Sequence, residues 1–168
     1  MKSNRLFYPL AVLASAVMVL LGGCGFHLQT KPELPPEMQR TRLEIQDPYG
    51  QFARRLQTHL EQSGVNIVTA AEGAAVLEVP LNAARKEIQS IGDNARVREF
   101  LVRHTVQFRL LSSDGTELVP LQTFEQSRIY SFNEQDILAA EREDEYLRNE
   151  LADSLARMVV RRLGTYEQ

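Results

Sequence analysis

The alternation of apolar and polar residues first becomes regular after residue 40. In residues 41–46, Leu43 and Ile45 fall on one side, as expected for a short strand with one buried face. Asp47 and Pro48 then suit the N-cap and first position of a helix, where an acceptor side chain and a missing N–H both fit. The pattern therefore predicts a strand followed directly by a helix.

The predicted helix is amphipathic. Phe52, Leu56 and Leu60 recur every four positions, and charged or amide side chains lie off that stripe. Gly64 ends the helix as a C′ glycine. Residues 65–69 are expected to form either a short strand or an extended connection.

Three longer strands are predicted next. Residues 76–88 are largely extended, a turn is expected at residues 91–94, and residues 118–132 return after the Asp114-Gly115 hairpin turn. The clearest alternation lies between them, in residues 99–110. Its apolar face contains Phe100, Val102, His104, Val106, Phe108 and Leu110, and its polar face contains Arg103, Thr105, Gln107 and Arg109.

A long helix is predicted from about Ala140 to Leu163. Its stripe consists of Leu147, Leu151, Leu155, Met158, Val159 and Leu163. Acidic residues dominate its first turns and arginines its last, which suits the helix macrodipole.

These elements predict an α+β fold. Two amphipathic helices should pack on one face of a mixed, mostly antiparallel sheet of about four strands, giving a two-layer sandwich. The crossover through the first helix should create at least one parallel strand pair.

The N-terminus is different in character. Lys2 and Arg5 precede an apolar run at residues 10–21, which resembles a secretory signal and is shorter than the roughly 20 residues of a spanning helix. Leu21-Gly22-Gly23-Cys24 has the form of a bacterial lipoprotein box, in which the thiol is lipidated and the chain is cut before the cysteine. The alternative is an ordinary signal with an incidental cysteine, but Cys24 is the only cysteine and has no partner in the chain.

This reading divides the chain into three parts. Residues 1–23 are a signal peptide, residues 24–40 a lipidated N-terminus and proline-rich tether, and residues 41–168 a single α/β domain. Removing the signal leaves 19 − 2 = 17 basic against 22 acidic residues, a formal charge of −5. This negative charge argues against a nucleic-acid partner, because binding to nucleic acid depends largely on basic residues that displace the counterions of the phosphates.

The sequence offers little for catalysis. His27, His59 and His104 lie far apart, nucleophile and phosphate-loop motifs are missing, and the carboxylates map to helix surfaces. His104 falls on an apolar strand face and is expected to be a hydrogen-bonded core residue. We therefore expect no catalytic residues, metal site or cofactor beyond the lipid on Cys24. A hydrolase would need His59 or His104 to face an acid or hydroxyl.

One basic cluster could bind an anionic lipid. If the two long strands pair, five basic side chains gather near one end of the sheet, and arginines there could hold phosphates. Interleaved Glu87, Asp93 and Glu99 offer ordinary surface ion pairs as the alternative. The candidate residues are Arg85, Lys86, Arg96, Arg98 and Arg103.

The opening Cys24-Gly25-Phe26-His27-Leu28 resembles the mature start of the LptE family of lipopolysaccharide-assembly lipoproteins. The resemblance continues in order through nearly the whole mature chain, at Leu34-Pro35, Leu43-Glu44-Ile45, Asp47-Pro48, Gly64-Val65 and Arg161-Arg162-Leu163.

The resemblance implies a non-enzymatic outer-membrane lipoprotein of the lipopolysaccharide transport complex. Such a protein acts as a plug and assembly factor for the LptD β-barrel and has lipopolysaccharide as a second partner. Gly25 in place of aspartate fits outer-membrane sorting. Another structural lipoprotein, such as a secretion pilot or an envelope adaptor, is the alternative.

Overall fold

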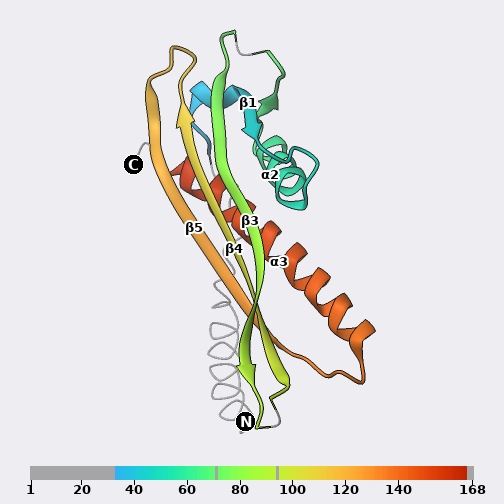
Figure 1. Cartoon of the computed structure of the whole chain (residues 1–168). Coiled ribbons are helices and arrows are strands. Elements are labelled where there is room, and N and C mark those ends of the chain that lie inside the picture. The colour runs from blue at the N-terminus through green and yellow to red at the C-terminus, as the bar shows by residue number, and fades with distance from the viewer. Residues whose placement is uncertain (1–32, 71, 94, 166–168) are drawn as a thin grey trace, which may run out of the picture. The chain divides into compact units, whose positions relative to one another are not determined.

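The computed structural model describes residues 33–70, 72–93 and 95–165. These residues form one sheet and two long helices (Figure 1). Among them, no helix has the length and apolar character needed to cross a bilayer. The predicted signal peptide, Cys24 and His27 lie outside the described residues.

Within the described residues, five strands form the sheet, in the order β2-β1-β3-β4-β5. Strand β1 pairs in parallel with both β2 and β3, and β3, β4 and β5 are antiparallel. The mixed sheet is confirmed, with five strands instead of about four because the short segment after the first helix pairs with β1. The elements are a 3-10 helix η1 (Pro36–Gln39), β1 (Arg40–Ile45), α2 (Gln51–Gln62), β2 (Asn66–Ile67), β3 (Ala75–Ile91), β4 (Val97–Leu111), β5 (Glu117–Ser131) and α3 (Ile137–Gly164).

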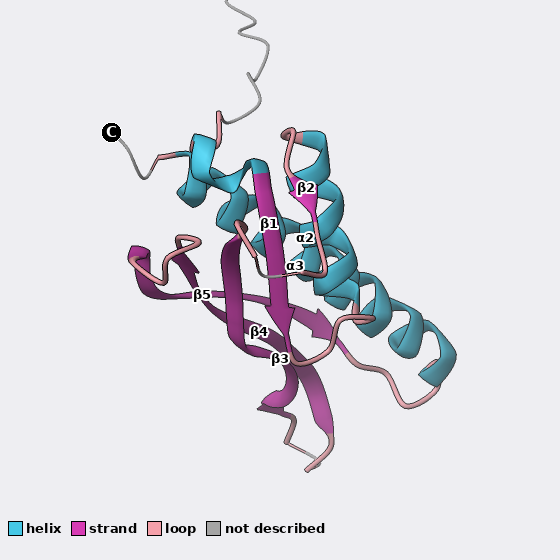
Figure 2. Cartoon of the chain, turned by 90° about the horizontal axis from the view of Figure 1, so that it is seen from above, coloured by secondary structure: helices cyan, strands magenta, loops and turns pink. Residues whose placement is uncertain are grey.

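Both helices cover the same face of the sheet, as expected (Figure 2). The main core joins the predicted stripe of α2, the apolar face of β4 and the C-terminal half of α3. Phe52, Phe108 and Leu155 are each at most 1% exposed. Met38 of η1 is also fully buried in this core, so residues of the predicted tether contribute to it. The boundaries between the signal, the tether and the domain stay predictions.

A second, smaller core lies beneath the N-terminal half of α3. Leu147 and Leu151 pack there with Val102 and Tyr130, beside the ring of Phe100. In the part of the chain that the structure describes, the sheet has three strands at this level, because β1 ends at residue 45 whereas β3 continues to residue 91.

Apart from the cross-strand pair Leu101 and Ile129, the face of the sheet opposite the helices is mostly polar, and it carries charges of both signs. Arg109 Nε donates to Glu78 Oε2 at 2.6 Å across β3 and β4. Arg103 lies 3.4 Å from Glu87 and also forms an ion pair with Glu125. The predicted polar parity of β4 therefore corresponds to this uncovered face.

The starts of both helices differ from the prediction. Helix α2 begins at Gln51, and Asp47 and Pro48 belong to a turn in which the Gly50 N–H donates to Asp47 O at 3.3 Å. The Asp47 carboxylate folds over Gly50 and occupies the space that an added Cβ would need. Helix α3 begins at Ile137, so its acidic residues start only in the second turn. Their interaction with the macrodipole is weaker there than the prediction assumed.

Candidate functional site

An open hollow of about 610 Å³ lies at one end of the three long strands. One wall is the hairpin between β3 and β4, and the other is the loop that joins β5 to α3 (Figure 1). Its charged and polar lining includes Ser90, Arg96, Arg98, Glu99, Asn133 and Glu134.

The backbone fixes the two walls together. The Phe132 N–H donates to the carbonyl of Arg98 at 2.7 Å, which extends the β4–β5 pairing into the loop. The hairpin closes through the Gly92 N–H, which donates to Arg96 O at 2.8 Å, and Ala95 adopts a positive φ of 58°. The predicted turn is thus present, and it places Arg96 beside the first residues of β4.

Both signs of charge meet in this hollow. Arg96 Nη1 lies 3.1 Å from Glu134 Oε2, and Ser90 Oγ donates to Glu99 Oε2 at 2.7 Å. Arg98 is the second arginine in the lining. The arrangement can bind an anion that has several oxygens, because guanidinium groups donate in a planar fork.

The five predicted basic residues do not form a single cluster. Arg96 and Arg98 share the hollow, whereas Arg85 and Arg103 face each other on the uncovered side of the sheet. Lys86 pairs in register with buried Val102, which places it on the helix side. Neighbouring strand residues point to opposite faces, so the sequence neighbours Arg85 and Lys86 are separated by the sheet itself.

Arg103 interacts mainly with carboxylates of this chain. Its guanidinium contacts Glu125, and that hydrogen bond and charge, together with Glu87, raise the pKa of Arg103. The same contact holds the pKa of Glu125 below its usual value. The sequence indicated Glu87 as a possible partner of Arg103. It did not indicate Glu125, which lies on the neighbouring strand β5.

Lys86 contacts a polar cluster under α3. Its Nζ lies 3.8 Å from Asp144 Oδ1 and 5.0 Å from the centre of the Phe100 ring. Arg148 Nε donates to Asp144 at 2.6 Å, and Tyr130 Oη donates at 3.3 Å. Burial, and then Asp144, raise the pKa of Tyr130 to about 12. In the sequence, this cluster is indicated only by the spacing of Asp144 and Arg148, which are four residues apart on the predicted helix.

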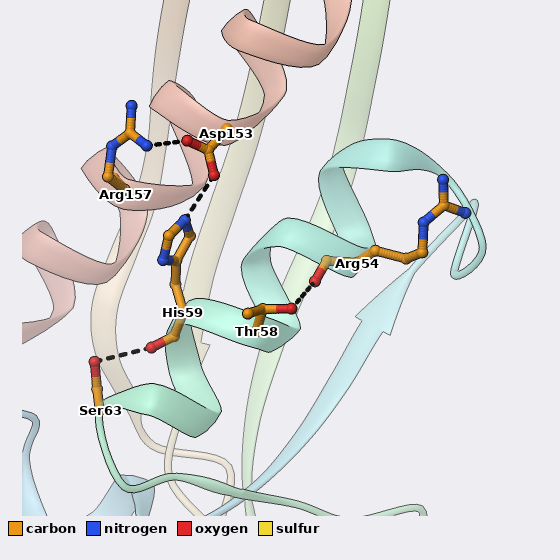
Figure 3. A network of polar contacts seen from close by, with 6 residues as sticks. All are labelled: Arg54, Thr58, His59, Ser63, Asp153 and Arg157. Atoms are coloured by element: carbon orange, nitrogen blue, oxygen red, sulfur yellow. Dashed lines mark hydrogen bonds and ion pairs between the residues drawn. The ribbon is translucent and has the colours of Figure 1, made fainter.

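His59 does face an acid, as the hydrolase alternative requires. Its Nε2 lies 2.9 Å from Asp153 Oδ1 between α2 and α3, and Arg157 donates to the other carboxylate oxygen (Figure 3). The two nearby hydroxyls, of Thr58 and Ser63, donate instead to backbone carbonyl oxygens. The network therefore joins two helices and presents no nucleophile to the imidazole.

Desolvation, followed by Arg157 and Arg55, lowers the pKa of His59. A side-chain hydrogen bond with Gln62 raises this pKa, but by less. A neutral imidazole that donates from Nε2 fits this setting.

His104 is a core residue, as predicted. It is 4% exposed, its Nε2 lies 2.7 Å from Asn82 Oδ1, and its ring packs edge-on against Phe52. Burial, and then Arg148, lower its pKa to about 4. Within the described residues, no group of three or more His, Cys, Asp or Glu side chains could hold a metal ion.

Comparison with known proteins agrees with the sequence resemblance. Residues 38–163 match the model of the LptE family, described as lipopolysaccharide-assembly. The LPS-assembly lipoprotein LptE of Yersinia enterocolitica is 31% identical over 92% of this chain and 74% of its own length. The corresponding protein of Yersinia pestis (strain Pestoides F) is 32% identical over 93% of this chain and 75% of its own.

A solved structure shares the fold. The solution structure of lipoprotein B from Nitrosomonas europaea has a TM-score of 0.71 and 24% identity, over 85% of this chain and 92% of that one. The match of residues 38–163 to the family model and the two Yersinia relatives show that the chain belongs to the LptE lipopolysaccharide-assembly family.

Proposed function

We propose that this protein is the lipid-anchored subunit of an outer-membrane complex that inserts lipopolysaccharide. In this proposal it serves as plug and assembly factor for an LptD-type β-barrel, and its domain faces the periplasm and the barrel lumen. The family match across residues 38–163 supports the general role. No catalytic step or cofactor is part of the proposal.

The uncovered sheet face supports the plug role. The lumen of a large outer-membrane barrel is polar, so a domain lodged there needs a polar surface of mixed charge. The ion pairs Arg109–Glu78 and Arg103–Glu125 lie on this face and leave it nearly balanced in charge.

The anchor is proposed at Cys24, through a diacylglyceryl group on the thiol and an acyl chain such as palmitate on the new amine. One acyl chain binds membranes only marginally, whereas several chains together anchor a protein stably. The proline-rich residues that follow would connect this anchor to the domain.

Lipopolysaccharide binding is proposed at the hollow between the hairpin and the β5–α3 loop. The observation on which this depends is that Arg96 and Arg98 line one open hollow, whereas Arg85, Lys86 and Arg103 lie elsewhere. Phosphate groups of the lipid would accept hydrogen bonds from the two guanidinium groups.

Two experiments test the proposal. Native acylated protein purified from membranes should bring an outer-membrane β-barrel with it, and purification without any barrel would contradict the plug role. In a binding assay with purified lipopolysaccharide, the double variant Arg96→Glu, Arg98→Glu should bind at least tenfold more weakly. The matched control is Arg85→Glu, Arg161→Glu, which changes the charge equally away from the hollow and should bind like the wild type.

A further inference from the structure

The hollow already contains a carboxylate in contact with one of its arginines. Glu134 belongs to the loop between β5 and α3, and its Oε2 lies 3.1 Å from Arg96 Nη1. We propose that Glu134 occupies the position on Arg96 that a phosphate group of the bound lipid takes. Glu134 would then be a specificity-determining residue, because an incoming anion has to displace it. This inference rests on the proposed lipid site.

The charges in the hollow show which anions can displace Glu134. Arg96 and Arg98 are opposed by Glu99 and Glu134, so the four side chains sum to zero. Glu99 is engaged by the Ser90 hydroxyl at 2.7 Å, whereas Glu134 contacts a guanidinium directly. A ligand with a single carboxylate would bring Arg96 the same charge and the same acceptor oxygens that Glu134 already provides. A phosphate monoester offers up to two charges and three acceptor oxygens, enough to reach both arginines.

The loop geometry allows this exchange without refolding. The backbone around Glu134 is fixed, because Asn133 Oδ1 accepts from the Gln135 N–H at 3.0 Å and Asn133 O accepts from the Asp136 N–H at 3.0 Å. The side chains of Arg96 and Glu134 are 64% and 49% exposed. The carboxylate can therefore rotate into solvent while both walls of the hollow stay in place.

Neutralising Glu134 should increase the affinity for the lipid slightly, whereas a substitution that merely damages the site would decrease it. Exposed ion pairs are weak, so removing the competing carboxylate should tighten binding by about threefold. The test compares the acylated mature wild type with acylated mature Glu134→Gln, using purified lipopolysaccharide and the same lipid after enzymatic removal of its phosphates. Tightening is expected only with the phosphorylated lipid.

Glu143→Gln is the matched control. It removes the same charge from α3, where Glu143 lines the neighbouring hollow with Tyr130 and Ala140. If Glu143→Gln tightens binding as much as Glu134→Gln, the effect is general electrostatics and the inference is overturned. It is also overturned if Glu134→Gln binds no more tightly than the wild type.

A third variant separates this inference from the proposed site. Arg96→Gln should weaken binding, and adding Glu134→Gln to it should then have no further effect, because the pair is already broken. If Arg96→Gln, Arg98→Gln binds like the wild type, the arginine site itself is wrong. If that variant binds weakly but Glu134→Gln does not tighten binding, only the role of Glu134 is overturned.

Discussion

His104 Nε2 on β4 lies 2.7 Å from Asn82 Oδ1 on β3, beneath the ring of Phe52. The pair satisfies one imidazole nitrogen in an otherwise apolar layer. Protonating the ring would place a charge there, which explains why burial lowers the pKa of His104 to about 4.

The first prediction is an acid-dependent loss of stability. The unfolded chain takes up a proton at His104 near pH 6.5, whereas the folded protein does so only near pH 4. The free energy of unfolding should therefore be highest above pH 6.5 and fall as the pH drops toward 4, by about 3 kcal/mol from this group. Urea unfolding at pH 7 and pH 4.5 measures the loss.

His104→Gln tests the origin of that loss. Glutamine can still donate to Asn82 but does not titrate, so the variant should lose clearly less stability between the two pH values. The carboxylates and His59 titrate in both proteins, so their contribution cancels in the comparison. An equal loss in wild type and variant would refute the assignment to His104.

The second prediction concerns the main core. Val106 of β4 is 0% exposed in the main core, so Val106→Asp would bury an unpaired charge and cost about 3–5 kcal/mol or unfold the domain. Gln107→Asp places the same side chain on the uncovered face and should retain the fold. Circular dichroism melts of the two variants distinguish these outcomes, and similar melting temperatures would contradict the assignment of the faces.

The third prediction concerns the cluster under α3. The side chain of Asp144 is 15% exposed and bonds Arg148 and Tyr130, so Asp144→Ala should cost about 1–2 kcal/mol of folding free energy. Lys86→Ala should cost less than about 1 kcal/mol, because Lys86 is 41% exposed. Urea unfolding measures both.

Hydrogen exchange adds a local measurement to the third prediction. Faster exchange in Asp144→Ala should appear in the first half of α3 and spare the C-terminal half, which packs in the main core. Uniformly faster exchange along α3 would show that the cluster has no local role.

The fourth prediction concerns the anchor. Mature protein from membranes should begin at Cys24 with a mass increased by a diacylglyceryl group and one acyl chain. Cys24→Ser should appear in the fraction that is not bound to membranes. An unmodified mature N-terminus in mass spectrometry would contradict lipidation.

The strands and helices with a regular pattern could be predicted, because a buried face requires an apolar residue at every second position of a strand and at about every fourth position of a helix. The apolar face of β4 and the stripe of α2 followed directly. The helix starts could not, because Asp47 and Pro48 suit a turn as well as an N-cap. The first turn of α3 contains Ile137 and Leu138, which are more than half exposed and lie outside the stripe.

The candidate site could be predicted only in part. Arg96 and Arg98 both follow the predicted turn closely, so their nearness to each other could be expected from the sequence. That Lys86 and Arg85 lie on opposite faces of the sheet follows only from the strand pairing of β3. The role of Glu134 depends on a contact between a hairpin and a loop almost 40 residues later in the chain. Contacts of this kind depend on tertiary packing and leave no local pattern.

Strand β5 has a consequence for the protein outside its complex. It ends the sheet as a 15-residue strand, and within the described residues only β4 pairs with it. Its outer row of amides and carbonyls is a template onto which any other extended chain could add. Pro120 removes one backbone N–H from β5. Because Pro120 lies near the start of the strand, it protects little of the length of β5 against pairing with another chain. A partner that encloses the domain would therefore also act as its chaperone against self-association.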